Sequence, residues 1–162
     1  MGNRVVIVGL DGATFDLLTP WVEAGLMPHL KRMIDEGVSG DLASSIPPVT
    51  APAWTSFFTG RNPGKHGVFD FVHQDRRSYA FHPVDSGSYY GKALWDVIGE
   101  QGRKVAVLNV PMTHPAYPVN GLLVSDFLLA TKKGAKSYPP EWLRQIEAEF
   151  GPYPTETVPP YF

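Results

Sequence analysis

A single threonine heads a helical pattern at the end of a proline-rich loop. Thr50 follows residues 46–49, "IPPV", and precedes residues 51–59, in which aromatic side chains recur at helical spacing before Gly60. A hydroxyl at a helix N-terminus faces unpaired backbone N–H groups and the positive end of the helix dipole, which together favour a phosphate group. Thr50 is therefore either an ordinary helix cap or a nucleophile that attacks phosphorus.

A second candidate residue is Asp11. Residues 5–10 form a continuous apolar run that ends in "DG", which predicts a strand buried on both faces of an α/β sheet. Asp11 would then lie at the carboxyl end of that strand, where open α/β sheets bind ligands, although a turn aspartate beside a glycine is the alternative. A threonine hydroxyl is a weak nucleophile until its pKa is lowered, and a metal ion is the obvious activator. The nucleophile hypothesis thus requires acidic metal ligands, and Asp11 is a candidate.

The composition restricts both the metal chemistry and the partners. The chain has no cysteine, which excludes disulfides and thiolate metal sites, so a metal would be held by carboxylates, imidazoles or hydroxyls. Its net charge of −2 gives no sign of the positively charged surface patch that binds nucleic acid or an anionic membrane, so we expect neither as a partner. The apolar run near the N-terminus is too short for a signal peptide or a transmembrane helix, and we therefore expect a cytoplasmic protein.

The segment 60–66, "GRNPGKH", resembles a phosphate-binding loop only superficially. Three residues, not four, separate Gly60 from Gly64, and His66 stands where serine or threonine would coordinate magnesium. We interpret the segment as a structured turn and His66 as a structural histidine. The other histidines lack a spacing typical of metal ligands; they are His29, His73, His82 and His114.

The spacing of apolar residues predicts alternating helices and strands. Strands are expected over 5–10, 40–44, 104–110 and 121–125, helices over 14–24, 28–36, 51–59, 92–101 and 140–150, and a hairpin within 69–84. This order indicates an α/β fold with a layered sheet and helices on both faces. The final segment, "GPYPTETVPPYF", carries no stop signal. We therefore expect residues 1–162 to be the N-terminal part of a single catalytic domain that is incomplete at its C-terminus.

Several blocks of the sequence together resemble a known family. The segments, in order, are "VVIVGLDGATFDLL", "MPHLKRMIDEGV", "IPPVTAPAWTSFFTGRNPGKHGVFDF", "GKALWDVIGEQGRKVAVLNVPMTHP" and "VNGLLVSDF". They resemble the N-terminal part of the type I phosphodiesterases/nucleotide pyrophosphatases of the alkaline phosphatase superfamily, and more narrowly its predicted phosphohydrolases or phosphomutases. The resemblance covers nearly the whole chain. It implies an alkaline-phosphatase-like fold and a metal-dependent phosphoric ester hydrolase of the phosphodiesterase or phosphatase type.

The resemblance also implies roles for particular residues. Asp11 matches the first metal-binding aspartate of the family, and Thr50 matches the hydroxyl nucleophile that also contacts a metal. The implied reaction is attack by Thr50 on a small-molecule phosphate ester, assisted by two divalent ions, zinc or manganese, followed by hydrolysis of a phosphothreonine. The backbone N–H of Ala51 is a candidate donor to the phosphate, and Asn109 and Thr113, at the end of the second buried strand, are candidate substrate contacts.

One departure from the family concerns the remaining metal ligands. In the family these lie in the C-terminal half and include an Asp-His-Gly segment, whereas no Asp-His pair occurs in the 162 residues. We therefore expect this chain alone to be inactive. The sequence leaves open a preference for monoesters or diesters. It also leaves open two alternatives: a phosphomutase or phosphotransferase, and a noncatalytic fragment or binding module.

Overall fold

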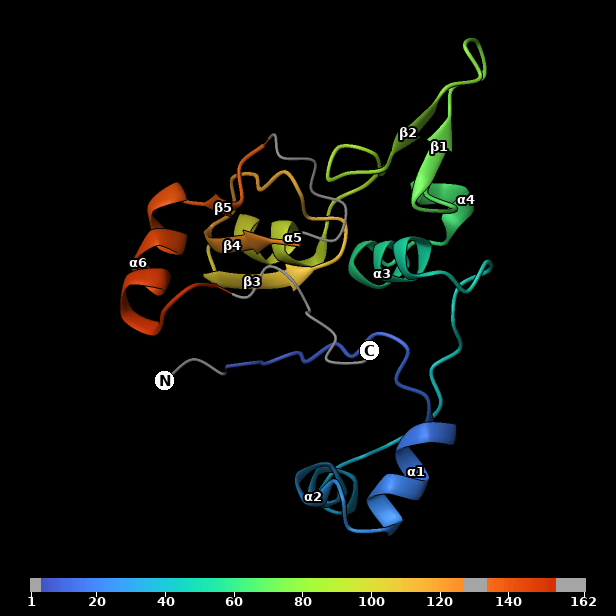
Figure 1. Ribbon diagram of the computed structural model, residues 1–162, viewed down its shortest axis with the longest axis vertical. Helices are drawn as coiled ribbons and strands as arrows, with labels where there is room; N and C mark the ends of the chain where they lie inside the picture. The colour runs from blue at the N-terminus through green and yellow to red at the C-terminus, as the bar shows by residue number, and fades with distance from the viewer. Residues whose placement is uncertain (1–3, 127–133, 154–162) are drawn as a thin grey trace. The chain divides into compact units, whose positions relative to one another are not determined.

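The computed structural model describes residues 4–126 and 134–153. Contacts divide the chain into two compact units, Met1–Ala43 and Ser44–Phe162. Figure 1 shows the helices and strands of each unit. Among the residues that the structure describes, no helix is both long enough and apolar enough to cross a membrane.

The first unit contains two helices, α1 (Phe15–Glu23) and α2 (Pro28–Glu36). Thr14 is the N-cap of α1, and its hydroxyl accepts a hydrogen bond of 3.2 Å from the backbone N–H of Asp16. Proline occupies the first turn of α2, where the lack of an N–H group costs little. Both helices form where the apolar spacing predicts them.

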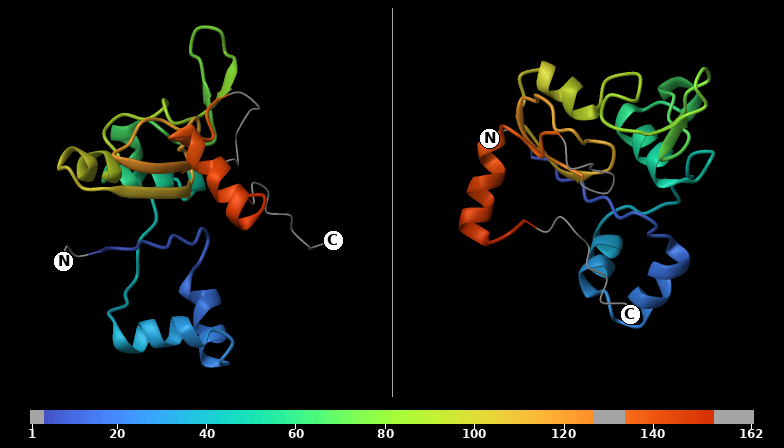
Figure 2. Two further views of the ribbon diagram at one scale, coloured as in Figure 1. Left: turned by 90° about the vertical axis from the view of Figure 1, so that its left-hand side faces the viewer. Right: turned by 45° about the horizontal axis from the view of Figure 1, so that its top comes forward.

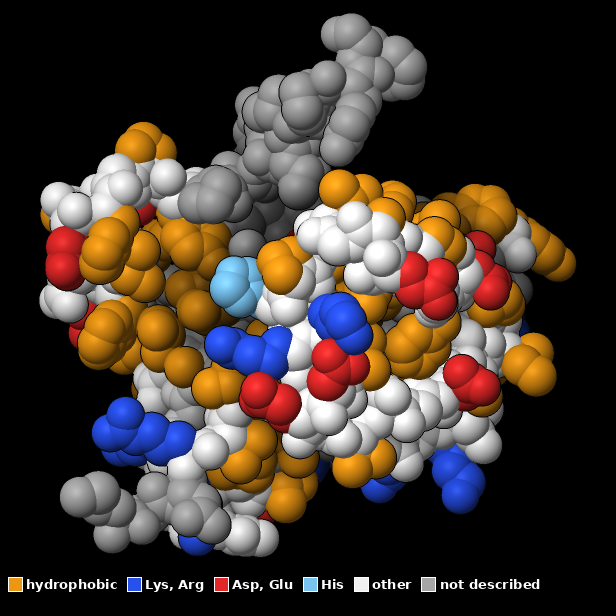
Figure 3. Space-filling view, turned by 90° about the horizontal axis from the view of Figure 1, so that it is seen from below, with side chains coloured by type: hydrophobic (Ala, Val, Ile, Leu, Met, Phe, Trp, Pro, Cys, Tyr) orange, Lys and Arg blue, Asp and Glu red, His pale blue; other side chains and the backbone are white. Residues whose placement is uncertain are grey.

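The strands predicted over 5–10 and 40–44 are absent. The structure assigns neither segment to a strand, and the apolar side chains of residues 5–10 are between 58% (Ile7) and 84% (Val6) exposed. A buried strand obtains its hydrogen-bond partners and its cover from neighbouring strands, and residues 4–43 contain none. The two strand predictions are therefore wrong in this structure. Figure 3 shows how widely apolar side chains are exposed on one face of the molecule.

The second unit contains a three-stranded sheet in the order β3 (Val105–Val110), β4 (Gly121–Ser125) and β5 (Ser137–Tyr138). β3 and β4 are parallel, and β5 pairs with β4 in the antiparallel direction. Since β3 pairs only with β4 among the described residues, it is an edge strand. Several of its residues are exposed or only partly buried, so the expectation of a buried strand there was wrong. The mixed α/β class itself is confirmed.

Two helices accompany this sheet. α5 (Leu94–Glu100) contacts β3, and α6 (Pro140–Phe150) contacts β5. Figure 1 shows α5 against the sheet and α6 beyond β5. The apolar spacing of "PEWLRQIEAEF" explains α6, because it gathers the apolar side chains on one stripe that buries Leu143.

The rest of the second unit comprises α3 (Thr50–Thr59), the short helix α4 (Pro63–His66) and a hairpin. The hairpin pairs β1 (Val72–Gln74) with β2 (Phe81–Pro83) in the antiparallel direction and places His73 opposite His82. Figures 1 and 2 show that the tip of the hairpin projects away from α3 and α4. The predicted hairpin is present, whereas the segment 60–66, predicted as a turn, contains the short helix α4.

The core of the second unit is built around Phe58. Its ring lies 5.0 Å from the ring of Tyr89 and 5.0 Å from that of Trp95, measured between ring centroids. The Nε1–H group of Trp95 donates a hydrogen bond of 2.6 Å to the hydroxyl of Tyr117. The polar atoms of this aromatic cluster are thus paired. The buried apolar residues around it are Ala51, Phe58, Val68, Val84, Ala93, Trp95, Val107, Met112 and Leu123.

Replacing Phe58 by leucine should destabilise the protein by about 1–3 kcal/mol, because two aromatic contacts are each worth about 0.5–1.5 kcal/mol. The free energy of unfolding in urea measures this loss. Phe57→Leu is the matched control, since Phe57 is the adjacent residue of α3 and is 48% exposed. An equal loss in both variants would show that the cluster around Phe58 contributes nothing beyond the general properties of the helix.

Candidate functional site

The backbone places Thr50 at the N-terminal end of α3. Val49 is the N-cap, with φ −114° and ψ 149°, and Thr50 is the first helical residue. The first backbone hydrogen bond of the helix joins the N–H of Ala53 to the carbonyl oxygen of Val49 at 3.0 Å. Since Pro52 has no N–H group, the helix begins with the N–H groups of Thr50 and Ala51.

The other hydroxyl groups of α3 are engaged within the helix. Thr55 Oγ1 donates to the carbonyl oxygen of Ala51 at 2.8 Å, and Ser56 Oγ donates to that of Pro52 at 2.7 Å. Such bonds to the preceding turn hold the side chains against the backbone. Thr50 precedes these residues and lies in the first turn of the helix.

The structure brings Ser56 and His66 together in an arrangement that resembles a catalytic pair. The Oγ atom of Ser56 lies 3.0 Å from Nε2 of His66, which is fully buried. However, the N–H of Val68 donates to Nδ1 of His66 at 3.1 Å, so Nδ1 carries no proton and Nε2 does. The imidazole therefore donates to Ser56 and does not take its proton. His66 joins α3 to α4, as expected for a structural histidine.

This buried histidine should make stability depend on pH. Burial lowers the pKa of His66 from its ordinary value of 6.5, and protonation would also place a proton opposite the N–H of Val68. The unfolded chain therefore binds this proton at a higher pH than the folded chain does. As the pH falls below about 6.5, the free energy of unfolding should decrease until the folded-state pKa is reached.

Urea denaturation of the protein and of His66→Gln between about pH 5 and pH 8 measures this effect, because the variant lacks the titrating group. We expect the stability difference between the two proteins to shrink at acidic pH. A difference that stays constant over the whole range would show that His66 does not cause the pH dependence.

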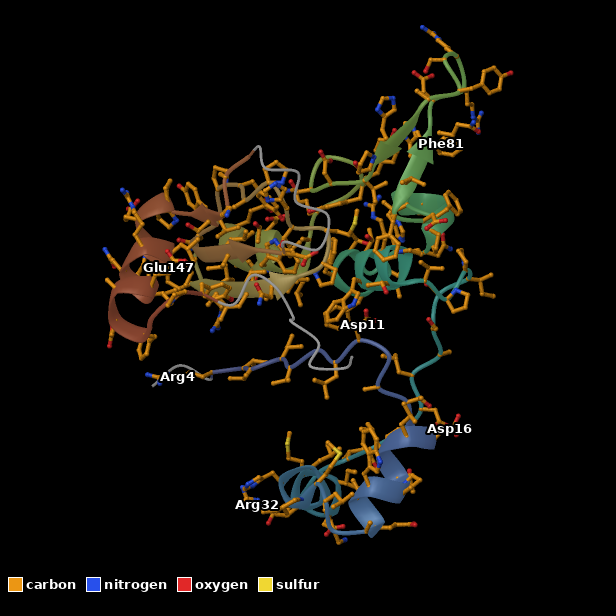
Figure 4. The ribbon with its side chains drawn as sticks, in the orientation of Figure 1. Arg4, Asp11, Asp16, Arg32, Phe81 and Glu147 are labelled. Atoms are coloured by element: carbon orange, nitrogen blue, oxygen red, sulfur yellow. The ribbon has the colours of Figure 1, made fainter. Side chains whose placement is uncertain are left out.

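Asp11 lies in a turn between the extended residues 5–10 and α1. The turn continues through Gly12, whose φ of +67° is in the left-handed region that favours glycine. Figure 4 shows Asp11 before the start of α1 and Asp16 in its first turn. Asp11 belongs to the first unit and Thr50 to the second, so the structure describes these two residues separately.

The two candidate substrate contacts lie at the end of β3. Asn109 is the irregular residue of the β3–β4 pairing and has a left-handed φ of +53°. Thr113 is fully buried; its hydroxyl donates to the carbonyl oxygen of Val110 at 2.6 Å and accepts from the N–H of Asp126 at 3.1 Å. Thr113 thus links the carboxyl ends of the two parallel strands. A substrate contact by Asn109 or Thr113 stays a prediction.

The two candidate metal ligands provide only part of a metal site. Asp11 and Thr50 offer oxygen donors of the kind that zinc and manganese accept. Within residues 4–126 and 134–153, however, no group of three or more histidine, aspartate or glutamate side chains is arranged to hold a metal ion. The described residues therefore do not by themselves form a two-metal centre, which needs more ligands than these two residues provide.

Four polar residues that no sequence motif indicates line one cavity. They are His82, Asp85, His114 and Asp126. His82 lies in β2 and Asp85 in the loop that follows it, His114 lies in the loop after β3, and Asp126 follows β4. The one available signal was that residues after β3 and after β4 must meet at the same edge of a parallel pair.

A comparison with family models supports the resemblance noted in the sequence. The model described as type I phosphodiesterase / nucleotide pyrophosphatase matches residues 5–159. No curated protein and no solved structure matches the chain significantly. The match includes the turn that holds Asp11, the whole of α3 and the sheet. The chain therefore belongs to the type I phosphodiesterase/nucleotide pyrophosphatase family.

Proposed function

We propose that the protein is a metal-dependent phosphoric ester hydrolase in which Thr50 is the nucleophile. The family indicates a hydrolase of the phosphodiesterase or pyrophosphatase type. The observation that carries the finer proposal is the position of Thr50 as the first residue of α3. There a hydroxyl lies beside the positive end of the helix dipole, which favours a phosphate group.

In the proposed reaction, Thr50 Oγ1 attacks the phosphorus atom of a small phosphate ester and the ester alcohol leaves from the opposite side. Water then hydrolyses the phosphothreonine, which regenerates the hydroxyl and releases phosphate or a monoester. The backbone N–H of Ala51 is the proposed donor to a nonbridging oxygen, where charge increases during the reaction. Asn109 and Thr113 remain proposed contacts for the rest of the substrate.

Two divalent ions, zinc or manganese, are the proposed cofactors. When bound, such ions stabilise negative charge on the attacking and leaving oxygens. Asp11 and Thr50 are the proposed ligands from this sequence. Because no Asp-His pair occurs in the 162 residues, we propose that the remaining ligands lie outside them and that this chain alone turns over little or no substrate.

The test compares this chain with a longer gene product that contains an Asp-His-Gly segment. Both are assayed with aryl phosphate monoesters and diesters in the presence of zinc or manganese. We expect metal-dependent hydrolysis by the longer protein only. Turnover by the 162-residue chain would contradict the proposal that its ligands are incomplete. Absence of turnover in the longer protein with either metal would contradict the hydrolase proposal.

The same assay examines the alternative of a phosphomutase or phosphotransferase. That enzyme would share the first step but would transfer the phosphate from Thr50 to a hydroxyl other than water. Analysis of the products formed in the presence of an added alcohol acceptor distinguishes the hydrolase from the phosphomutase or phosphotransferase. The hydrolase should release inorganic phosphate or a monoester at an unchanged rate, whereas a transferase should form a new phosphate ester.

A further inference from the structure

The hairpin places two histidines directly opposite each other. His73 of β1 pairs with His82 of β2 in the antiparallel register, so the two side chains lie on the same face of the hairpin. The centres of their rings are 6.1 Å apart, and the ring planes are tilted by 33°. The two residues form no spacing motif in the sequence. The turn of the hairpin brings them together.

The ring nitrogens of this pair are available to a ligand. Neither imidazole forms a hydrogen bond or an ion pair with the part of the chain that the structure describes. The contrast is His66, whose Nε2 and Nδ1 atoms are bound to Ser56 and to the N–H of Val68. Both residues of the pair are exposed, so an ion reaches them directly from the solvent. A neutral imidazole nitrogen is the commonest metal ligand that proteins provide.

Backbone hydrogen bonds hold the pair in register from both sides. Toward the base of the hairpin, the N–H of Val84 donates to the carbonyl oxygen of Phe71 at 2.9 Å. Toward its tip, the N–H of Asp75 donates to the carbonyl oxygen of Ala80 at 2.9 Å. Val84 is 5% exposed and belongs to the core of the second unit, so the base of the hairpin is anchored. Ligands that are positioned before binding lose less conformational entropy when the ion arrives.

The distance between the rings suits a single metal ion. A zinc–nitrogen bond is about 2.0–2.1 Å long, so two imidazoles that bind one ion have ring centres roughly 5–6 Å apart. The observed 6.1 Å requires only a small rotation of two exposed side chains. Imidazole ligands favour zinc, copper and nickel, whereas magnesium and calcium prefer oxygen ligands.

The protein supplies two ligands to such an ion. The nearest acidic residue along β1 is Asp75, and its Oδ1 atom accepts a hydrogen bond of 2.7 Å from the N–H of Arg77 within the turn. No group of three or more histidine, aspartate or glutamate side chains is placed to hold a metal within the described ranges 4–126 and 134–153. We therefore expect water at the remaining positions of the ion.

We propose that His73 and His82 together bind a divalent ion of zinc, copper or nickel that bridges β1 and β2. A two-stranded hairpin is marginally stable by itself, and the tip of this hairpin projects away from α3 and α4 (Figures 1 and 2). Figure 4 shows its side chains and labels Phe81, the neighbour of His82 in β2. An ion bound to one residue of each strand would hold the two strands together. The proposal does not depend on Thr50 or Asp11.

The experiment titrates the chain, without a histidine tag, with zinc and follows the imidazole resonances of its histidines by NMR. We expect saturable shifts at His73 and His82 and none with magnesium. Zinc should also slow the hydrogen exchange of the Asp75 N–H group, which bonds across the hairpin. His73→Ala and His82→Ala should each weaken zinc binding at the hairpin by at least about tenfold, since loss of even an outer partner costs about 10–100-fold.

Two variants serve as controls and should leave the zinc affinity of the hairpin unchanged. His29→Ala removes an exposed histidine from α2, in the first unit. Gln74→Ala perturbs the hairpin without removing an imidazole, because Nε2 of Gln74 donates to the carbonyl oxygen of Tyr79 at 3.2 Å. The second control thus separates loss of a ligand from loosening of the turn.

Four results would overturn the proposal. The first is the absence of shifts at His73 and His82 at millimolar zinc. The second is a loss of affinity in only one of the two histidine variants, which would mean that the ion has a single ligand and bridges nothing. The third is an equal loss in a control variant, and the fourth is unchanged hydrogen exchange at Asp75 under saturating zinc. If His82→Ala fails to fold, His73→Ala decides alone, and unchanged affinity in it contradicts the proposal.

Discussion

Thr50→Ala should lower kcat for phosphate ester hydrolysis by at least about 10³-fold in a metal-loaded protein that includes the proposed remaining ligands, because removal of a covalent nucleophile eliminates the main reaction path. Thr50→Ser keeps a hydroxyl at the first position of α3 and should retain most of the activity. Steady-state assays with an aryl phosphate ester measure both effects. Mass spectrometry of quenched reactions should detect a phosphorylated residue in the parent protein and none in Thr50→Ala.

The control for this prediction is another threonine of the same helix. Thr59 lies at the other end of α3, and its hydroxyl bonds to the carbonyl oxygen of Thr55. Thr59→Ala removes a hydroxyl from α3 without touching its N-terminus, so kcat should change little. Similar losses in Thr50→Ala and Thr59→Ala would indicate damage to the helix. Full activity in a folded Thr50→Ala protein would exclude Thr50 as the nucleophile.

Elements with strong local signals were predicted well from the sequence. The bounds of α2, β4 and α6 agree with the expected ranges 28–36, 121–125 and 140–150. Each has a start signal or a clear apolar period, and α2 and α6 both have proline in the first turn and glycine at the end. Their formation is determined mainly by residues within the element itself.

The strand predicted over 5–10 had an equally strong local pattern and nevertheless failed. A strand is defined by hydrogen bonds to a neighbour, and the run "VVIVGL" contains no information about which neighbour supplies them. The same limit applies to β3. Its apolar sequence predicts burial, but the exposure of its side chains depends on what packs against the two faces of the sheet.

In the candidate site, too, some features follow from the local sequence and others depend on tertiary packing. The position of Thr50 follows from helix-start signals in its own segment, and the structure places it within one residue of the expected N-cap. The pairing of Ser56 with His66 depends on how α4 packs against α3. The cavity depends on the pairing of β3 with β4 and on the loop after β2. Such tertiary arrangements bring together residues whose spacing in the sequence carries no signal.

Gly121→Ala should destabilise the protein by about 2–6 kcal/mol, the combined range for overpacking and for a strained backbone. Gly121 begins β4 with a φ of +153°, and a Cβ atom added there would lie 2.0 Å from the carbonyl oxygen of Val105. Val105 is its pairing partner in β3, and the N–H of Val105 donates to the carbonyl oxygen of Asn120 at 3.1 Å. An alanine would therefore force the two strands apart where their pairing begins.

Gly102→Ala separates the two causes of this expected loss. Gly102 also has a left-handed φ, +77°, but nothing lies within 4 Å of an added Cβ atom. Gly102→Ala should therefore lower the free energy of unfolding by about 1–2 kcal/mol, which is the cost of a left-handed backbone conformation alone. Urea denaturation of both variants measures the difference. Equal losses in the two variants would mean that an added Cβ atom at Gly121 is accommodated without cost, and the close approach of Gly121 to Val105 would then not restrict how the first residues of β3 and β4 pair.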